Sequence, residues 1–94
     1  MTTSEYTAFV AQPDDRPPVQ QQIEASLALE KATRRYHAAI DVTEETKRVG
    51  NYAWYQSARA SEQERALEYA AAVRAKRLAD QAVARQRLRQ GGAA

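Results

Sequence analysis

Apolar and small side chains recur at helical spacing along two long stretches of this chain, and both stretches lack glycine and proline. The first runs from Val19 to Arg48 and the second from Tyr52 to Gln90. One stripe of the first stretch consists of Leu29, Ala32, Tyr36, Ala39 and Thr43, with Ile40 beside it. A second stripe consists of Val19, Ile23 and Leu27 and ends at charged Glu30 and Arg34. Such spacing predicts amphipathic helices, so we expect an all-α fold.

The sequence Val49-Gly50-Asn51 is the strongest interior break. Glycine and asparagine both tolerate the positive φ at which helices commonly end. We therefore expect two helices, at about 18–48 and 52–90, and a short connection of this kind usually gives an antiparallel hairpin. One long bent helix is the alternative. Two further boundaries are considered, because Asp41 could re-cap the first helix and Ser61-x-x-Glu64 fits a capping box in the second.

Residues 1–18 differ from the helical part in composition. Three prolines lie between Gln12 and Val19, and consecutive prolines favour an extended backbone. We expect an N-terminal arm and linker (1–18), a helical domain (19–90) and a flexible tail (91–94) that starts at Gly91-Gly92. Tyr6, Phe9 and Val10 lie at helical spacing in the arm. They are either an anchor that binds a neighbouring chain or a frayed terminus.

Large apolar residues are too few for a deep core. Leu, Ile, Val and Phe together make up 14 of the 94 residues, whereas Ala alone accounts for 20. Alanine is the strongest helix former but buries little surface. We expect a helical chain that is marginally stable alone and is completed by self-association or by a protein partner. No sustained hydrophobic heptad is visible, so the sequence does not predict a regular coiled coil.

The sequence offers little for catalysis. There is no cysteine, and His37 is the only histidine, so thiolate metal sites and histidine clusters are excluded. Glu44 and Glu45 are neighbours and do not face each other on a helix. No phosphate-binding loop or nucleophile motif is present. We expect no enzyme activity, no cofactor, no metal and no small-molecule substrate.

Targeting signals are also missing from the sequence. The N-terminus lacks a basic region followed by an apolar run, and no uncharged run reaches the length of a membrane span. We expect a cytoplasmic protein or one held within a macromolecular assembly. Arg outnumbers Lys 11 to 3, and Arg and Ala both have GC-rich codons, which favours a phage or bacterial setting.

Charge is unevenly distributed. Residues 74–90 contain six basic residues and one acid, a net charge of +5, whereas residues 1–30 carry −4. One helical face collects Arg74, Arg77, Gln81 and Arg85, with Arg89 in the next turn. Such a stripe can follow a nucleic-acid backbone or an acidic protein surface. It can also be a solvated face, because the helix dipole favours cations near the C-terminus of a helix.

An aromatic cluster follows the break and comprises Tyr52, Trp54 and Tyr55. Tyrosine and tryptophan are enriched in interface hot spots, and they also stack on unpaired bases. In a leucine-poor chain we favour packing, either at the end of the hairpin or at an interface, over base stacking.

A short cysteine-free hairpin with a tryptophan near its turn is similar in architecture to the small Trp-X-Gly hairpin proteins of type VII secretion. The motifs depart from that family, because Gly50 precedes Trp54 by four residues, which is the reverse of its motif. The position four residues after Tyr69 is Val73 and not an acid. We do not assign the chain to this family.

These observations together predict a non-enzymatic structural or assembly subunit that packs by helix–helix contacts into a homo-oligomer or a larger complex. Two alternatives remain: a nucleic-acid-binding protein that uses the basic second helix, and a small helical inhibitor or adaptor that lays one helix in a partner's groove.

Overall fold

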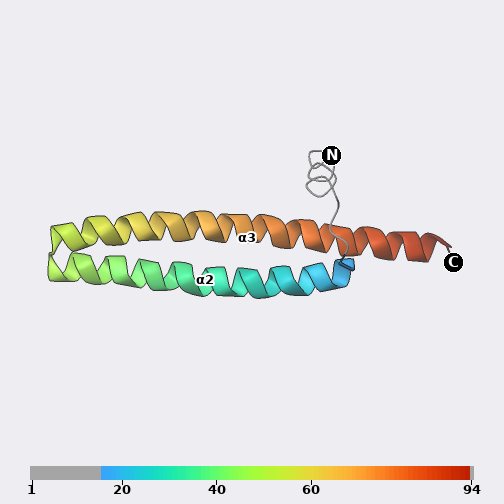
Figure 1. The fold of residues 1–94 in the computed structure, drawn as a ribbon, viewed down its shortest axis with the longest axis horizontal. Coiled ribbons are helices and arrows are strands. Elements are labelled where there is room, and N and C mark those ends of the chain that lie inside the picture. The colour runs from blue at the N-terminus through green and yellow to red at the C-terminus, as the bar shows by residue number, and fades with distance from the viewer. Residues whose placement is uncertain (1–15, 94) are drawn as a thin grey trace, which may run out of the picture.

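The computed structural model describes residues 16–93, and these residues form a helical hairpin (Figure 1). Helix α2 spans Pro18–Val49 and helix α3 spans Tyr52–Ala93. The two helices lie side by side and antiparallel, joined by the two-residue turn at Gly50 and Asn51. The all-α hairpin is confirmed, and the alternative of one bent helix is wrong.

Helix α2 begins at a proline pair. Pro17 is extended, with φ −57° and ψ 145°, and Pro18 occupies the first turn, where its missing N–H costs nothing. The Pro17 carbonyl accepts the first helical hydrogen bond, from the Gln21 N–H at 3.0 Å. The helix then continues unbroken through the considered boundary at Asp41, and Thr43 is buried in it.

Gly50 and Asn51 have different tasks in the turn. Gly50 takes the left-handed conformation, with φ 80°, and its N–H donates to the Thr46 carbonyl at 3.0 Å. Asn51 caps α3 instead: its Oδ1 accepts the Trp54 N–H at 2.9 Å, and its carbonyl accepts the Tyr55 N–H at 2.9 Å. Because this cap satisfies the first turn, α3 begins at Tyr52 and runs straight through Ser61.

Helix α3 extends beyond the expected end at Gly91-Gly92, to Ala93. Each glycine weakens a helix by about 1 kcal/mol relative to alanine but does not by itself end it. At 1.5 Å per residue the 32 residues of α2 span about 48 Å and the 42 residues of α3 about 63 Å. The C-terminal end of α3 therefore projects past the start of α2 (Figure 1).

The residues that face the opposite helix are spaced alternately three and four apart, which is the heptad spacing of a coiled coil. We call them the seam. On α2 the seam consists of Gln22, Ala25, Leu29, Ala32, Tyr36, Ala39, Thr43 and Thr46. On α3 it consists of Tyr55, Ala58, Glu62, Arg65, Tyr69, Ala72, Lys76, Ala79, Val83 and Gln86. All of these are buried or half-buried. The predicted stripe of Leu29, Ala32, Tyr36, Ala39 and Thr43 is confirmed. Polar residues such as Gln22, Arg65 and Lys76 interrupt the seam, so it is not a continuous hydrophobic heptad.

The seam gives the hairpin a thin core. Among the described residues the buried apolar side chains are Ala32, Ala58, Ala79 and Val83. Thr46 has the largest side chain that is completely buried. Small side chains let helix backbones approach closely but remove little apolar surface from water. The expectation of a helical chain without a deep core is therefore met across residues 16–93.

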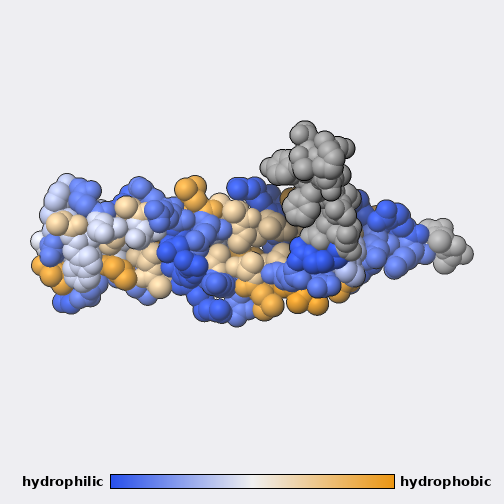
Figure 2. Space-filling model, in the orientation of Figure 1, coloured by the Kyte–Doolittle hydropathy of each residue, from blue (hydrophilic) through white to orange (hydrophobic). Residues whose placement is uncertain are grey.

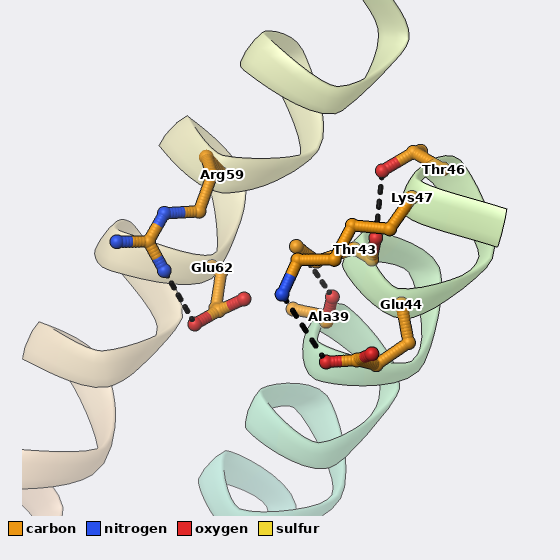
Figure 3. Close-up of polar contacts among 7 residues, drawn as sticks. All are labelled: Ala39, Thr43, Glu44, Thr46, Lys47, Arg59 and Glu62. Carbon is orange, nitrogen blue, oxygen red and sulfur yellow. Dashed lines mark hydrogen bonds and ion pairs between the residues drawn. The ribbon is translucent and has the colours of Figure 1, made fainter. Parts of the chain in front are cut away.

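Polar contacts near the turn stay within each helix (Figure 3). The Thr43 hydroxyl donates to the Ala39 carbonyl at 3.1 Å, and the Thr46 hydroxyl donates to the Thr43 carbonyl at 2.7 Å. Glu44 pairs with Lys47 on α2, and Arg59 pairs with Glu62 on α3. Because the buried threonines satisfy their hydroxyls locally, no buried side-chain polar atom of the described part lacks a partner.

The turn gives the first prediction. Open space surrounds a Cβ built at Gly50, so only the positive φ opposes a side chain there. We expect Gly50→Ala to lower the free energy of unfolding by about 1 kcal/mol. Gly50→Asn is the matched control and should lower the free energy of unfolding by less, because asparagine tolerates the left-handed conformation. Urea denaturation measures both; equal stability of wild type and Gly50→Ala would contradict the left-handed cap.

Candidate interaction surfaces

Three surfaces are expected from the sequence, and the structure describes two of them. Tyr6, Phe9 and Val10 of the arm lie outside the described residues. The aromatic cluster lies at the closed end of the hairpin, and the arginines lie towards the open end, on the part of α3 that approaches and passes the start of α2. The aromatic and arginine surfaces are therefore at opposite ends of the molecule.

The aromatic cluster is split between the seam and the surface. Tyr55 is half-buried at a seam position, and it lines a small hollow at the turn together with Thr46. Tyr52 and Trp54 are exposed, and the Tyr52 hydroxyl accepts a hydrogen bond from the Gln56 amide. The intramolecular packing expected for the cluster is found for Tyr55, whereas Tyr52 and Trp54 remain available to a partner.

The arginines in the second half of α3 are exposed and carry uncompensated charge. Arg74, Arg77, Arg85 and Arg89 are all exposed, and none forms an ion pair with another described residue; the same holds for Arg87. Basic residues nearer the turn behave differently, since Arg48, Arg59 and Arg65 each pair with a glutamate. The unpaired charge is therefore concentrated in the second half of α3.

Asp80 is the centre of one contact between the helices. Gln22 Nε2 on α2 donates to Asp80 Oδ1 at 2.7 Å, and Lys76 Nζ lies 2.8 Å and 2.7 Å from the two carboxylate oxygens. The hydrogen bond from Lys76, followed by that from Gln22, lowers the pKa of Asp80 below its ordinary value of 3.8. Because Gln22 and Asp80 are on different helices, the charged carboxylate helps to fix their register.

A second set of contacts joins the middle of the two helices. The rings of Tyr36 and Tyr69 meet with their centroids 5.6 Å apart and tilted by 31°. Arg35 on α2 lies 3.6 Å from the Glu68 carboxylate, which also accepts a hydrogen bond from Arg65 at 2.6 Å. These charged groups are partly exposed, and such pairs contribute only about 0–1 kcal/mol. The tyrosine pair is therefore the main specific contact here.

Most of the large aliphatic side chains of residues 16–93 point away from the seam, which the sequence reasoning did not predict; Leu29 and Val83 lie in it. Four of the five leucines are exposed: Leu27, Leu67, Leu78 and Leu88. The exposed fractions of Leu67 and Leu78 are 73% and 63%. On α2 the stripe formed by Val19, Ile23 and Leu27 is exposed as well, and an apolar patch follows the N-terminal part of α2 in Figure 2.

A signal for these outward leucines is present in the sequence. Leu67, Leu78 and Leu88 are separated by eleven and ten residues, which is close to three helical turns, so they share one side of α3. Leu78 also borders a shallow groove between the helices, beside Ala75, Ala82 and Arg85. Alanine is so abundant on every side of α3 that this spacing does not stand out in the sequence.

Residues 16–93 hold no group of three or more histidines and acids placed to bind a metal ion. His37 is exposed, and its ring stacks on that of Tyr36 with the two ring centroids 6.4 Å apart. Neither α2 nor α3 has an apolar stretch of the length that crossing a membrane requires. The absence of enzyme activity stays a prediction.

No protein-family model, no curated protein and no solved structure matches this chain.

Asp80 gives a pH prediction. Its pKa is lower in the folded than in the unfolded chain, so its contribution to stability is complete above the unfolded value and is lost as the pH falls through the folded value. We expect the urea midpoint to fall as the pH drops below about 4. Asp80→Asn should be less stable at neutral pH and should show a smaller fall.

The matched control is Asp41→Asn, because Asp41 is exposed and forms no ion pair within the described hairpin. It should keep the wild-type dependence on pH. An Asp80→Asn midpoint that falls as steeply as that of the wild type would show that this carboxylate does not stabilise the hairpin.

Proposed function

We propose that this protein is a structural or assembly subunit that packs through its helix faces against other protein chains. The observation that carries the proposal is the inversion of side-chain size across the hairpin. The most deeply buried seam residues are small (Ala32, Ala58, Ala79, Thr43, Thr46 and Val83), whereas Leu27, Leu67, Leu78 and Leu88 face outwards. Surface leucines placed singly are ordinary, but here they include most of the leucines of the chain.

The thin seam supports the same conclusion through stability. A Leu side chain that moves from water into a protein interface contributes about 1.5–3 kcal/mol, and the hairpin leaves most of this unused. Helix contacts with other chains would supply the missing burial. Outward apolar side chains lie on both helices, on α2 at Ile23 and on α3 at Leu78, so the hairpin offers a surface on each of its helices.

The proposal predicts association that stabilises the fold. We expect the mass measured by light scattering to rise from that of a monomer as the concentration increases through the micromolar range. The midpoint of thermal unfolding should rise with concentration as well, because association stabilises the folded state by mass action. A cooperative, highly stable monomer whose midpoint does not depend on concentration would contradict an assembly role.

A second candidate is supported by the unpaired arginines of α3. Arg74, Arg77, Arg85 and Arg89 could contact phosphates along a nucleic-acid backbone. We favour the protein contact because Leu78 and Leu88 are interspersed with these arginines and are exposed, and a phosphate backbone offers leucine nothing to pack on.

Salt dependence separates the two candidates. If the chain binds nucleic acid, its affinity for duplex or single-stranded probes should fall steeply with salt, and Arg77→Glu with Arg85→Glu should abolish binding. Unchanged binding by that double variant would exclude this use of the helix. Charge reversal at Arg34, which pairs with Glu30 on α2, is the matched control.

A further inference from the structure

The exposed side of α3 carries a second row of residues spaced alternately three and four apart, and Leu78 and Arg85 in this row also border the groove between the helices. We call this row the outer stripe: Ser57, Ala60, Glu64, Leu67, Ala71, Arg74, Leu78, Gln81, Arg85 and Leu88. Every one of them is exposed. What distinguishes this row is that it holds all the leucines of α3, Leu67, Leu78 and Leu88, at exposed positions, while α2 already occupies the seam. The outer stripe therefore has the form of a second helix-packing face, which no other helix of residues 16–93 covers.

We propose that two copies of this chain pair through their outer stripes, antiparallel and about a two-fold axis. This inference rests on the proposed assembly function and names its partner. The pairing is isologous, so each contact occurs twice. The axis passes midway along α3, between Ala72 and Val73, which lets the whole of Tyr52–Ala93 overlap the same helix of the other copy.

In this register the residue numbers of two facing residues, one from each copy, add to 145. Leu67 of each copy therefore faces Leu78 of the other. The two leucine pairs flank Ala71, whose small side chain lets the helices approach at the centre. Further out, Ser57 faces Leu88 of the other copy. The register therefore brings the two central leucines of the stripe together.

Charge favours the antiparallel direction. Residues 74–90 of α3 carry a net charge of +5, whereas residues 52–73 contain two arginines and three glutamates and carry −1. Antiparallel pairing sets each basic half against the slightly acidic half of the other copy, while parallel pairing would stack the two basic halves. Glu64, which has no ion pair within residues 16–93, faces Gln81 and lies one turn from Arg77 and Arg85 of the other copy.

The extent of the face sets the expected strength. A strip about 63 Å long and about 10 Å wide covers roughly 600 Å² per copy. Stable interfaces bury about 800 Å² per partner, so the dimer should form in the micromolar range. The two Arg74 side chains lie close to the two-fold axis and repel each other, and this repulsion weakens the dimer further. The α2 helices remain outside the pair, with Ile23 and Leu27 still exposed for additional contacts.

Sedimentation of the full chain tests the contacts by charge exchange. Glu64→Arg and Arg85→Glu should each weaken the dimer about tenfold, and the double variant should recover to within about threefold of wild type. Leu78→Ala should weaken it about tenfold, with no loss of helix by circular dichroism. Arg74→Ala should tighten it, an effect that a stripe made for an acidic partner or for nucleic acid would not show. Asp41→Arg on α2 is the control and should leave the dimer unchanged.

Cross-linking tests the register directly, because the chain has no cysteine of its own. Ser57→Cys with Leu88→Cys should oxidise to a covalent dimer. The two sites lie about 46 Å apart on one helix, so they cannot join within a chain. Each single variant should form no covalent dimer on oxidation, whereas a parallel dimer would be cross-linked by Ser57→Cys alone.

The outcomes separate this inference from the assembly function. A dimer that is insensitive to Leu78→Ala and to both charge reversals would overturn the outer-stripe pairing and leave the assembly function standing. A marginally stable monomer at all concentrations would overturn self-pairing and leave a different protein as the partner. A highly stable, concentration-independent monomer would overturn both.

Discussion

The close contact of α2 and α3 through small side chains is the constraint on which the rest of the molecule depends. Ala32, Ala58 and Ala79 are buried in the seam, and Thr43 and Thr46 complete it near the turn. Small residues permit close packing of helix backbones, but each contributes little burial. The hairpin therefore obtains its direction and register from the seam, from the Gly50 turn and from a few specific contacts such as Tyr36 with Tyr69.

The large side chains lie mostly outside this contact. Small side chains fill the most deeply buried seam positions, and four of the five leucines occupy the outer faces, with only Leu29 half-buried between the helices. An isolated helix pair with this distribution has apolar surface on its outside and modest stability inside. A protein built in this way is suited to packing against other chains, and its fold and its associations then contribute to the same free energy.

Charge is arranged along the length of the hairpin in a related way. Near the turn, arginines pair with glutamates one helical turn away, as at Arg48 with Glu45 and Arg59 with Glu62. The second half of α3 contains one acidic residue, Asp80, and Lys76 and Gln22 already bind its carboxylate. The exposed arginines there give the molecule a polarity from one end to the other, and they make antiparallel association electrostatically favourable.

The sequence by itself determined the two helices, their break at Gly50-Asn51 and the face of α2 that carries Leu29, Tyr36 and Thr43, because helix propensity, glycine and apolar spacing act locally. The start of the second helix at Tyr52 was predicted as well, and the structure adds its cap at Asn51 and its continuation to Ala93. Only the tertiary structure decided which residues of α3 form the seam with α2. That seam was invisible because Gln22, Arg65 and Lys76 occupy positions where heptads usually show leucine. Several sides of α3 are rich in alanine, and the approach of the two backbones across the hairpin decides which of them meets α2. The sequence of one helix does not contain this information.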